Sequence, residues 1–224
     1  MGRPTLGEMA KWFEAGLLDL GHEVSFSERY AEHGAINIFW ESFNRDFNRQ
    51  LRESRIPFGI IGTEIPDGSG FNWRRDGAWP ARFAAFEEIA SEAKFVWTTI
   101  ESAIPYYGTF SSTAFVELGF SERLLPLHQN ADPDIDFFFY GLDTPYRRAA
   151  VEKIRRYATV EWPAHFLSDA DVEILISRGK VGLNFKQSER WPIPSPTRLG
   201  RLLMAKRAVA AEFVPVPTRQ GELV

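Results

Sequence analysis

Two loops in the second half of the sequence bring basic residues to the start of a predicted helix. The first, FYGLDTPYRR, leads from a buried strand through Gly141 into a helix that begins at Pro145 and carries Arg147 and Arg148 in its first turn. Free backbone N–H groups and the positive end of the helix dipole favour a phosphate there, and the two guanidinium groups add positive charge. The loop therefore predicts phosphate binding. A solvated arginine pair on an ordinary helix explains it equally well, because neither a Walker nor a GxGxxG spacing is present.

The second loop, NFKQSERWPIPSPTRLGRLL, repeats this arrangement. Lys186 follows a strand, and a helix opens with Ser195 as its cap, Pro196 in its first turn, and Thr197 and Arg198 next. If both loops follow strands of one sheet, their helix starts converge, and a diphosphate would fit between them. The alternative is a helix cap with scattered surface cations.

The elements that position these loops alternate between strand and helix. IDFFFYG is a nearly continuous apolar run, typical of a strand buried on both faces of a parallel sheet. Strands separated by helices of roughly 10 to 15 residues predict parallel βαβ units, whose ligands lie at the carboxyl ends of the strands. In this half we predict strands at 135–141, 159–166, 180–185 and 208–214, and helices at 145–157, 168–178 and 197–206.

The first half shows the same alternation. An apolar stripe at spacings of three and four predicts a helix at 5–20. A long loop at 66–79 is predicted to lie over a functional site, because loops of this length are uncommon in compact domains. The polar segment HQNADPD, residues 128–134, is the predicted linker between halves 1–127 and 135–224. We predict further strands at 22–27, 35–40, 57–61 and 94–100, and further helices at 44–55 and 83–93.

Composition excludes several classes of protein. The absence of cysteine rules out disulfides, thiolate zinc sites and thiol nucleophiles. A net charge of −4 gives no broad electrostatic reason to bind nucleic acid. The sequence has no apolar run long enough for a signal peptide or a membrane span, so we expect a cytoplasmic protein. The sequence contains no GxSxG elbow, so a serine hydrolase is not indicated. No metal site is expected, because the four histidines lack the spacing of metal ligands; they are His22, His33, His128 and His165.

Several strings together resemble the donor-binding half of GT-B glycosyltransferases, specifically small bacterial polysaccharide-type members. They are DIDFFFYGLDTPYRRAAVEKIRR, KVGLNF and RLGRLLMAKRAVAAEF. In the first half, GLLDLGHEV, INIFWES, IIGTEI and RLLPL are similar to the first helix and following strands of that family. The resemblance covers most of the chain through short motifs. It implies an α/β fold of two Rossmann-like halves with mainly parallel sheets.

The resemblance also implies roles for individual residues. A glycine would allow close approach of the nucleotide diphosphate, cations and a helix start would hold phosphate or ribose, and an acidic residue would follow the last strand. On this chain these are Gly141, Arg147, Arg148, Lys186, Ser195, Thr197, Arg198 and Glu212. Glu64 would face the cleft as a general base or an acceptor contact.

We therefore expect a metal-independent transferase that moves a sugar from a nucleotide-diphosphate donor to an unknown acceptor. The family's first strand should precede residue 5, where only MGRP stands, and its closing helices should follow VPTRQGELV. This departure favours an alternative, a catalytically degenerate nucleotide- or sugar-binding protein or the subunit of a complete transferase. In that case a second copy or a partner protein would cover the open sheet edge. An unrelated α/β enzyme acting on a phosphorylated metabolite is a third reading.

Overall fold

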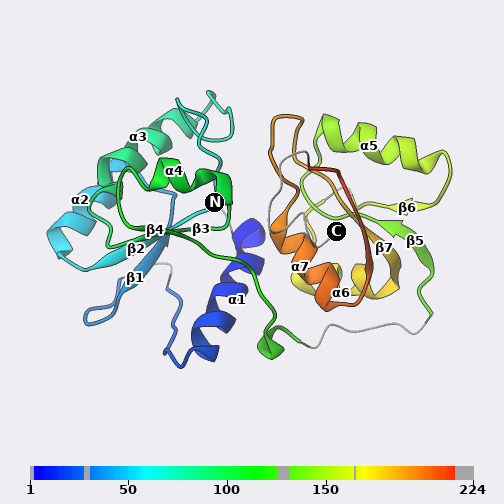
Figure 1. The fold of residues 1–224 in the computed structure, drawn as a ribbon, viewed down its shortest axis with the longest axis horizontal. Helices are drawn as coiled ribbons and strands as arrows, with labels where there is room; N and C mark the ends of the chain where they lie inside the picture. The colour runs from blue at the N-terminus through cyan, green and yellow to red at the C-terminus, as the bar shows by residue number, and fades with distance from the viewer. Residues whose placement is uncertain (1–2, 28–30, 126–131, 164, 215–224) are drawn as a thin grey trace. The chain divides into compact units, whose positions relative to one another are not determined.

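The chain forms two compact α/β units (Figure 1). The computed structural model describes residues 3–27, 31–125, 132–163 and 165–214. The central unit comprises Ser25–Glu117, and the carboxyl-terminal unit comprises Leu118–Val224 together with Met1–Val24. Each unit contains one four-stranded sheet, and every pair of neighbouring strands is parallel. The predicted α/β class with two Rossmann-like halves is confirmed.

The amino-terminal helix α1 (Arg3–Asp19) packs within the carboxyl-terminal unit. Its Trp12 ring lies so close to Gly200 that a Cβ there would come within 2.9 Å of it. Its Lys11 forms an ion pair with Asp169 at 2.5 Å. The helix therefore packs against residues that lie far from it in the sequence. The predicted linker at 128–134 falls largely on residues 128–131, which lie outside the described residues.

In the central unit the strands lie in sequence order: β1 (Asn37–Trp40), β2 (Phe58–Gly62), β3 (Val96–Thr98) and β4 (Thr113–Phe115). All five residues of β2 are buried, as expected for an inner parallel strand. The connecting helices are α2 (Arg45–Ser54), α3 (Trp79–Ala90), the short η1 (Glu101–Ala103) and α4 (Ile104–Tyr107). Asn44 caps α2 by accepting a hydrogen bond from the Phe47 N–H at 2.9 Å.

Two expectations for this region need correction. Residues 22–27 form no strand, although Val24 and Phe26 alternate with polar residues. Phe26 is 62% exposed, and no described strand pairs with this segment, so the alternation has no face to bury. Conversely, β4 is only three residues long, and its apolar pattern is too short to be recognised from the sequence.

In the carboxyl-terminal unit the strand order is β6-β5-β7-β8. The strands are β5 (Ile135–Phe138), β6 (Val160–Glu161), β7 (Gly179–Asn184) and β8 (Ala208–Ala211), and the helices are α5 (Pro145–Arg155), α6 (Asp169–Arg178) and α7 (Pro196–Met204), preceded by η2 (Glu122–Leu124). Alternate residues of β5 point to opposite faces. Phe138 packs in a cluster with residues of α6 and α7, whereas the following Phe139 packs with Val151 of α5. Helices therefore cover both faces of this sheet (Figure 1).

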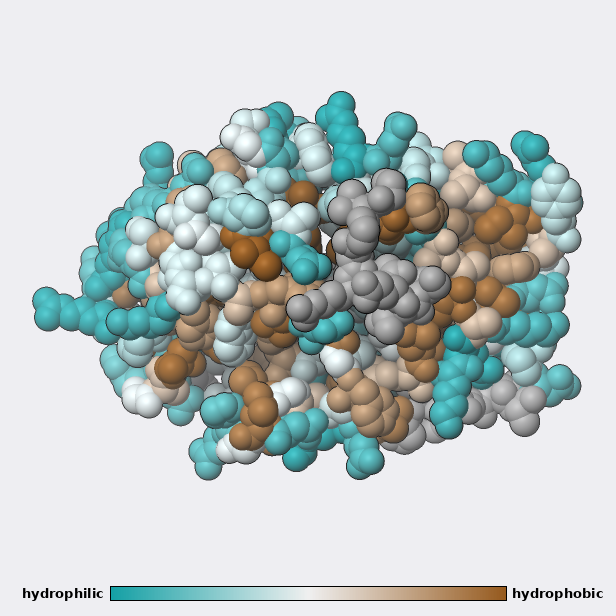
Figure 2. Space-filling model, in the orientation of Figure 1, coloured by the Kyte–Doolittle hydropathy of each residue, from teal (hydrophilic) through white to brown (hydrophobic). Residues whose placement is uncertain are grey.

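The surface is mixed in character. On the face shown in Figure 2, hydrophilic and hydrophobic side chains are interspersed. Large apolar residues such as Tyr157 and Phe213 are exposed, which is ordinary for a folded protein. Within the part of the chain that the structure describes, no helix is long and apolar enough to cross a membrane.

Candidate functional site

The carboxyl edge of the β5–β7–β8 sheet brings together most of the residues predicted for the donor site. Gly141 follows β5, Lys186 follows β7 and Glu212 follows β8. Because these strands are parallel, the three positions lie at one edge of the sheet. Arg147 and Arg198 reach the same edge from the first turns of α5 and α7.

Both helices begin as their sequences predict. The Thr144 hydroxyl accepts a hydrogen bond from the Arg147 N–H at 3.2 Å, with Pro145 as the first residue of α5. The Ser195 hydroxyl accepts one from the Arg198 N–H at 3.3 Å, with Pro196 as the first residue of α7. Each cap satisfies one of the free N–H groups of the first turn and fixes the direction in which the chain enters the helix.

Gly141 lies between the two buried arginines. Its φ of 131° is strained for any residue with a side chain. A Cβ at this position would collide with Nη2 of Arg198 and would lie 3.6 Å from Nη1 of Arg147. Gly141 itself is exposed. The absence of a side chain therefore leaves room for the Arg198 guanidinium beside the backbone of Gly141.

Arg147 is 5% exposed and is held by backbone carbonyls. Its guanidinium donates to the carbonyls of Leu142 and Lys186, each at 3.0 Å, and of Phe185 at 3.3 Å. It also lies 5.3 Å from the centre of the Phe139 ring. Burial, and then the charge of Arg198, lower the pKa of Arg147. The positive charge is therefore unfavourable, although each of the three guanidinium nitrogens donates a hydrogen bond.

Arg198 is 6% exposed and has fewer partners. Its Nη1 donates to Oδ1 of Asn184 at 3.0 Å, and its guanidinium lies 4.7 Å and 5.2 Å from the rings of Phe139 and Tyr140. Its buried Nε has no hydrogen-bond partner. Burial lowers the pKa of Arg198. No carboxylate among the described residues forms an ion pair with Arg198 or with Arg147.

The other predicted cations are neutralised. Lys186 Nζ lies 3.1 Å from Oε1 of Glu212, and its backbone N–H donates to Oε2 at 3.1 Å. The Tyr146 hydroxyl donates to the same carboxylate, so Glu212 is fixed from two sides. Arg148 is exposed and pairs with Asp143 at 2.9 Å, outside this group.

Thr197 completes the predicted set. Its hydroxyl lies 2.9 Å from the Ser195 hydroxyl, next to the start of α7. The structure therefore brings seven of the eight predicted donor-site residues together at one edge, and Arg148 points into solvent with its own partner.

The ninth predicted residue, Glu64, lies at the carboxyl edge of the central unit, just after β2. Its Oε1 accepts a hydrogen bond from Nη2 of Arg82 at 2.7 Å, and its Oε2 accepts one from the Asn72 side chain. Asn72 belongs to the long loop predicted at 66–79 and has a φ of 55°. The loop thus folds back onto the strand end, and both oxygens of Glu64 are occupied by donors.

A second carboxylate at this edge escaped the sequence reading. Glu41 directly follows β1 and is completely buried. Its Oε1 accepts from the Thr63 hydroxyl at 2.6 Å, and its Oε2 accepts from the Thr63 N–H at 2.5 Å. Burial, and then the charge of Glu64, raise the pKa of Glu41 from 4.5 to about 8. Glu41 stands directly after the apolar strand β1, but the family resemblance that selected Glu64 assigned Glu41 no role.

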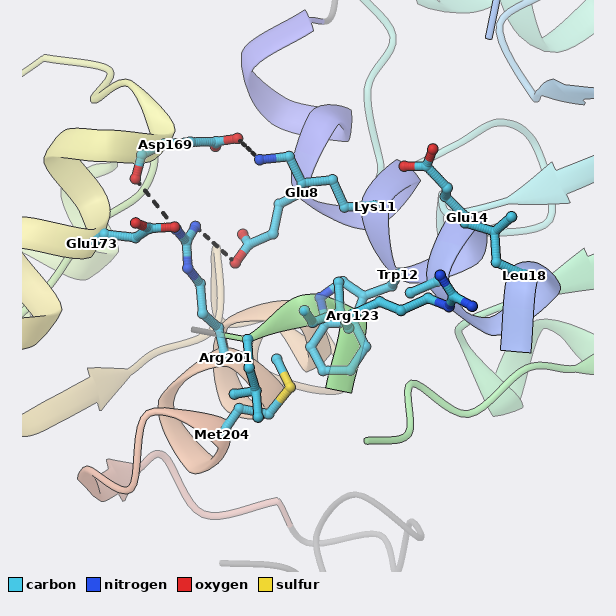
Figure 3. Close-up of a pocket in the computed structure, with 13 residues that line it drawn as sticks. Glu8, Lys11, Trp12, Glu14, Leu18, Arg123, Asp169, Glu173, Arg201 and Met204 are labelled. Atoms are coloured by element: carbon cyan, nitrogen blue, oxygen red, sulfur yellow. Dashed lines mark hydrogen bonds and ion pairs between the residues drawn. The ribbon is translucent and has the colours of Figure 1, made fainter. Parts of the chain in front are cut away.

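The carboxyl-terminal unit also has a cavity of about 410 Å³ lined by α1, η2, α6 and α7 (Figure 3). Arg201 lies 3.2 Å from Glu8 and 3.6 Å from Glu173, and Lys11 pairs with Asp169. The lining includes none of the nine residues discussed above. Its charged side chains largely pair with one another, and these contacts attach α1 to α6 and α7.

Comparisons with known proteins add no assignment. No protein-family model matches the sequence, and neither a curated protein nor a solved structure matches it. The resemblance to GT-B glycosyltransferases remains a prediction, and function must be argued from the two sheet edges.

Proposed function

We propose that the carboxyl-terminal unit binds a nucleotide-diphosphate sugar at the carboxyl edge of its sheet, and that the protein transfers the sugar to an acceptor without a metal ion. The diphosphate would lie over Gly141, between the starts of α5 and α7. Cationic side chains and helix amino termini would stabilise the negative charge that develops on the leaving diphosphate.

The observation that carries this proposal is the pair Arg147 and Arg198. Burying a positive charge without an ionic partner is unfavourable by several kcal/mol, and such groups are normally paired. Two adjacent buried guanidinium groups increase this cost, because the charge of Arg198 further disfavours the charged form of Arg147. An anion at Gly141 would remove the imbalance, and phosphate oxygens match the planar donors of a guanidinium.

The remaining residues fit the rest of such a ligand. Glu212 is held by Lys186 and Tyr146, so its position is fixed before any ligand arrives. A carboxylate fixed at a strand end can accept hydrogen bonds from ribose hydroxyls. Lys186, already paired with Glu212, would contribute to the local potential rather than contact phosphate alone.

The alternative, a binding protein without transferase activity, draws support from Glu64. A general base needs a free oxygen, and both oxygens of Glu64 accept hydrogen bonds from Arg82 and Asn72. A nucleotide-binding protein of this kind would differ from the transferase only in turnover of the donor, whereas a sugar-binding protein or a partner subunit would not need to bind nucleotide. Hydrolysis of the donor without acceptor would favour the transferase.

Calorimetric titration with a panel of nucleoside diphosphates and nucleotide sugars tests the proposal. We expect one nucleotide class to bind, and Arg198→Ala to weaken that binding about tenfold to a hundredfold, since a charge-assisted hydrogen bond contributes roughly 1.5 to 3 kcal/mol. Arg148→Ala is the matched control, because Arg148 lies on the same helix as Arg147 but pairs with Asp143 in solvent. Equal affinity in the wild type and Arg198→Ala would place the ligand elsewhere.

A further inference from the structure

The guanidinium group of Arg198 has one edge without hydrogen-bond partners. Its Nη1 donates to Oδ1 of Asn184 at 3.0 Å, but no described residue accepts a hydrogen bond from Nε or Nη2. These two nitrogens, the free edge of Arg198, carry parallel N–H bonds that match two oxygens of one phosphate group. Arg147 differs, because each of its guanidinium nitrogens donates to a backbone carbonyl.

The residue that holds Arg198 in place is neutral. Asn184 is the last residue of β7 and is 1% exposed. Its amide orientation is fixed from two sides, because Oδ1 accepts from Arg198 and Nδ2 donates to the Ser195 carbonyl at 3.1 Å. An aspartate has nearly the same shape and would form an ion pair here, as is usual for a buried arginine. Asn184 instead provides an acceptor for one N–H without cancelling the charge.

The carboxylate whose charge reaches Arg198 belongs to another ion pair. Burial lowers the pKa of Arg198, and the nearby Tyr140 and Glu8 oppose this only in part. The Glu8 carboxylate forms its ion pair with Arg201 at 3.2 Å. Within the part of the chain that the structure describes, Arg198 therefore keeps a buried charge that no carboxylate pairs with.

We propose that Asn184 is a positioning residue that holds Arg198 with a neutral amide, and that the free edge of Arg198 binds two oxygens of one phosphate group. The inference rests on the proposed function, in which that phosphate belongs to the nucleotide-diphosphate donor. Nη2 lies directly against the backbone of Gly141, which is exposed and has no side chain. A small backbone shift on binding uncovers the buried Nε beside it. Arg147 supports the surrounding loops and leaves the phosphate contact to Arg198.

NMR of the arginine Nε–H groups tests this contact directly, with inorganic phosphate as the probe. Arg198→Lys identifies the Arg198 resonance by its loss. We expect phosphate to move the proton resonance of Arg198 downfield, because a charge-assisted hydrogen bond forms where there was none. The Arg147 resonance is the internal control and should stay in place, since its Nε already donates to the Lys186 carbonyl. Absence of phosphate binding, or a larger shift at Arg147 than at Arg198, overturns the inference.

Two substitutions of Asn184 separate its neutrality from its structural role. Asn184→Asp adds a carboxylate beside Arg198 and should weaken phosphate binding about tenfold or more. Asn184→Ala removes the same two hydrogen bonds without adding a charge, and it should retain affinity to within about threefold. An unchanged affinity in Asn184→Asp, or an equal loss in both variants, overturns the role of the neutral amide. If Asn184→Asp does not fold, the affinity of Asn184→Ala decides this role, because a loss of tenfold or more would make Asn184 merely structural.

Titration of the same proteins with nucleoside diphosphates separates this inference from the proposed function. Binding of both phosphate and nucleotide that weakens in Asn184→Asp supports the two together. If phosphate binds as expected and no nucleotide does, the proposed function fails and the phosphate site at Arg198 stands. If a nucleotide binds with equal affinity to the wild type and Asn184→Asp, the inference fails and other groups hold the donor.

Discussion

Replacing the two buried arginines by methionine should have different effects on stability, because every guanidinium nitrogen of Arg147 has a hydrogen-bond partner whereas Nε of Arg198 has none. Arg147 donates to three backbone carbonyls, whereas Arg198 donates to Asn184 alone and leaves its Nε without a partner. Methionine keeps the length and apolar character of the side chain and packs well against aromatic rings. The comparison therefore isolates the charge and its hydrogen bonds.

In Arg147→Met, three carbonyls lose a charged donor. Each unsatisfied buried group is unfavourable by roughly 1 to 3 kcal/mol, and removal of the buried charge offsets part of this loss, so we expect the free energy of unfolding to fall by about 3 kcal/mol. In Arg198→Met, one amide oxygen loses its donor for about 1 to 3 kcal/mol, but removal of an uncompensated buried charge returns several kcal/mol. The stability of Arg198→Met should be equal to that of the wild type or greater. Its nucleotide affinity should nevertheless fall at least tenfold.

Urea unfolding without ligand gives the stabilities, and the same titration at saturating nucleotide gives the linked stabilisation, roughly 2.7 kcal/mol when the ligand is at a hundred times its dissociation constant. That increment should appear in the wild type and in Arg148→Met, and at the same ligand concentration it should fall to about 1.4 kcal/mol or less in Arg198→Met, whose affinity is at least tenfold weaker. If Arg198→Met is as unstable as Arg147→Met and keeps its ligand-induced stabilisation, Arg198 is a structural residue and the reasoning about an uncompensated charge is refuted.

Three further predictions follow from the same geometry. Between pH 4.5 and about 8 the folded protein keeps a proton on Glu41 that the unfolded chain has lost, so the free energy of unfolding should fall as the pH rises through this window. The fall should amount to several kcal/mol, at about 1.4 kcal/mol per pKa unit, and urea titrations at a series of pH values should show that Glu41→Gln loses this dependence. Gly141→Ala should lower stability by about 1 to 3 kcal/mol because of its φ of 131°, and it should displace Arg198 and weaken nucleotide binding. Gly7→Ala, on a helix with open space around it, should leave nucleotide binding unchanged and stability unchanged or slightly raised, as calorimetry can show. Trp12→Ala should destabilise the carboxyl-terminal unit by about 3 to 5 kcal/mol, because the buried indole attaches α1 to α7, and an unchanged unfolding transition would contradict this role for α1.

Local pattern was enough to predict the helix starts and the sheet edge on which they lie. Ser195 with Pro196, and Thr144 with Pro145, are short-range signals, and the structure bears out both caps. The parallel sheets follow from alternation of strands with helices, which again is local. By contrast, the attachment of α1 to α7 depends on the contact of Trp12 with Gly200, which lies 188 residues later in the chain. No sequence pattern near either residue indicates this contact.

Which side chains of the candidate site are buried could not be predicted from the sequence either, because burial also depends on packing between distant residues. Arg147 and Arg148 are adjacent in the sequence, yet one is 5% exposed and the other lies in solvent beside Asp143. Which of the two faces inward depends on the rotation of α5 about its own axis, and that rotation is set by packing of Val151 against Phe139. Glu41 differs, because its position after an apolar strand was visible. The sequence did not indicate that Arg82 of α3 approaches both acids and lies closer to Glu64 than to Glu41, so it could not distinguish the two.

The two sheet edges carry charge imbalances of opposite sign, and this difference predicts how each responds to pH. At the edge beside Gly141, neither Arg147 nor Arg198 forms an ion pair with a carboxylate of the described residues, and an anion from solution would relieve this imbalance. At the edge beside Thr63, Glu41 and Glu64 share Arg82, and the imbalance is relieved by a proton. Glu41 belongs to the central unit, so its titration should change the stability of that unit and leave nucleotide affinity at the other unit unchanged. A nucleotide affinity that follows the titration of Glu41 would contradict the assignment of the donor site to the carboxyl-terminal unit.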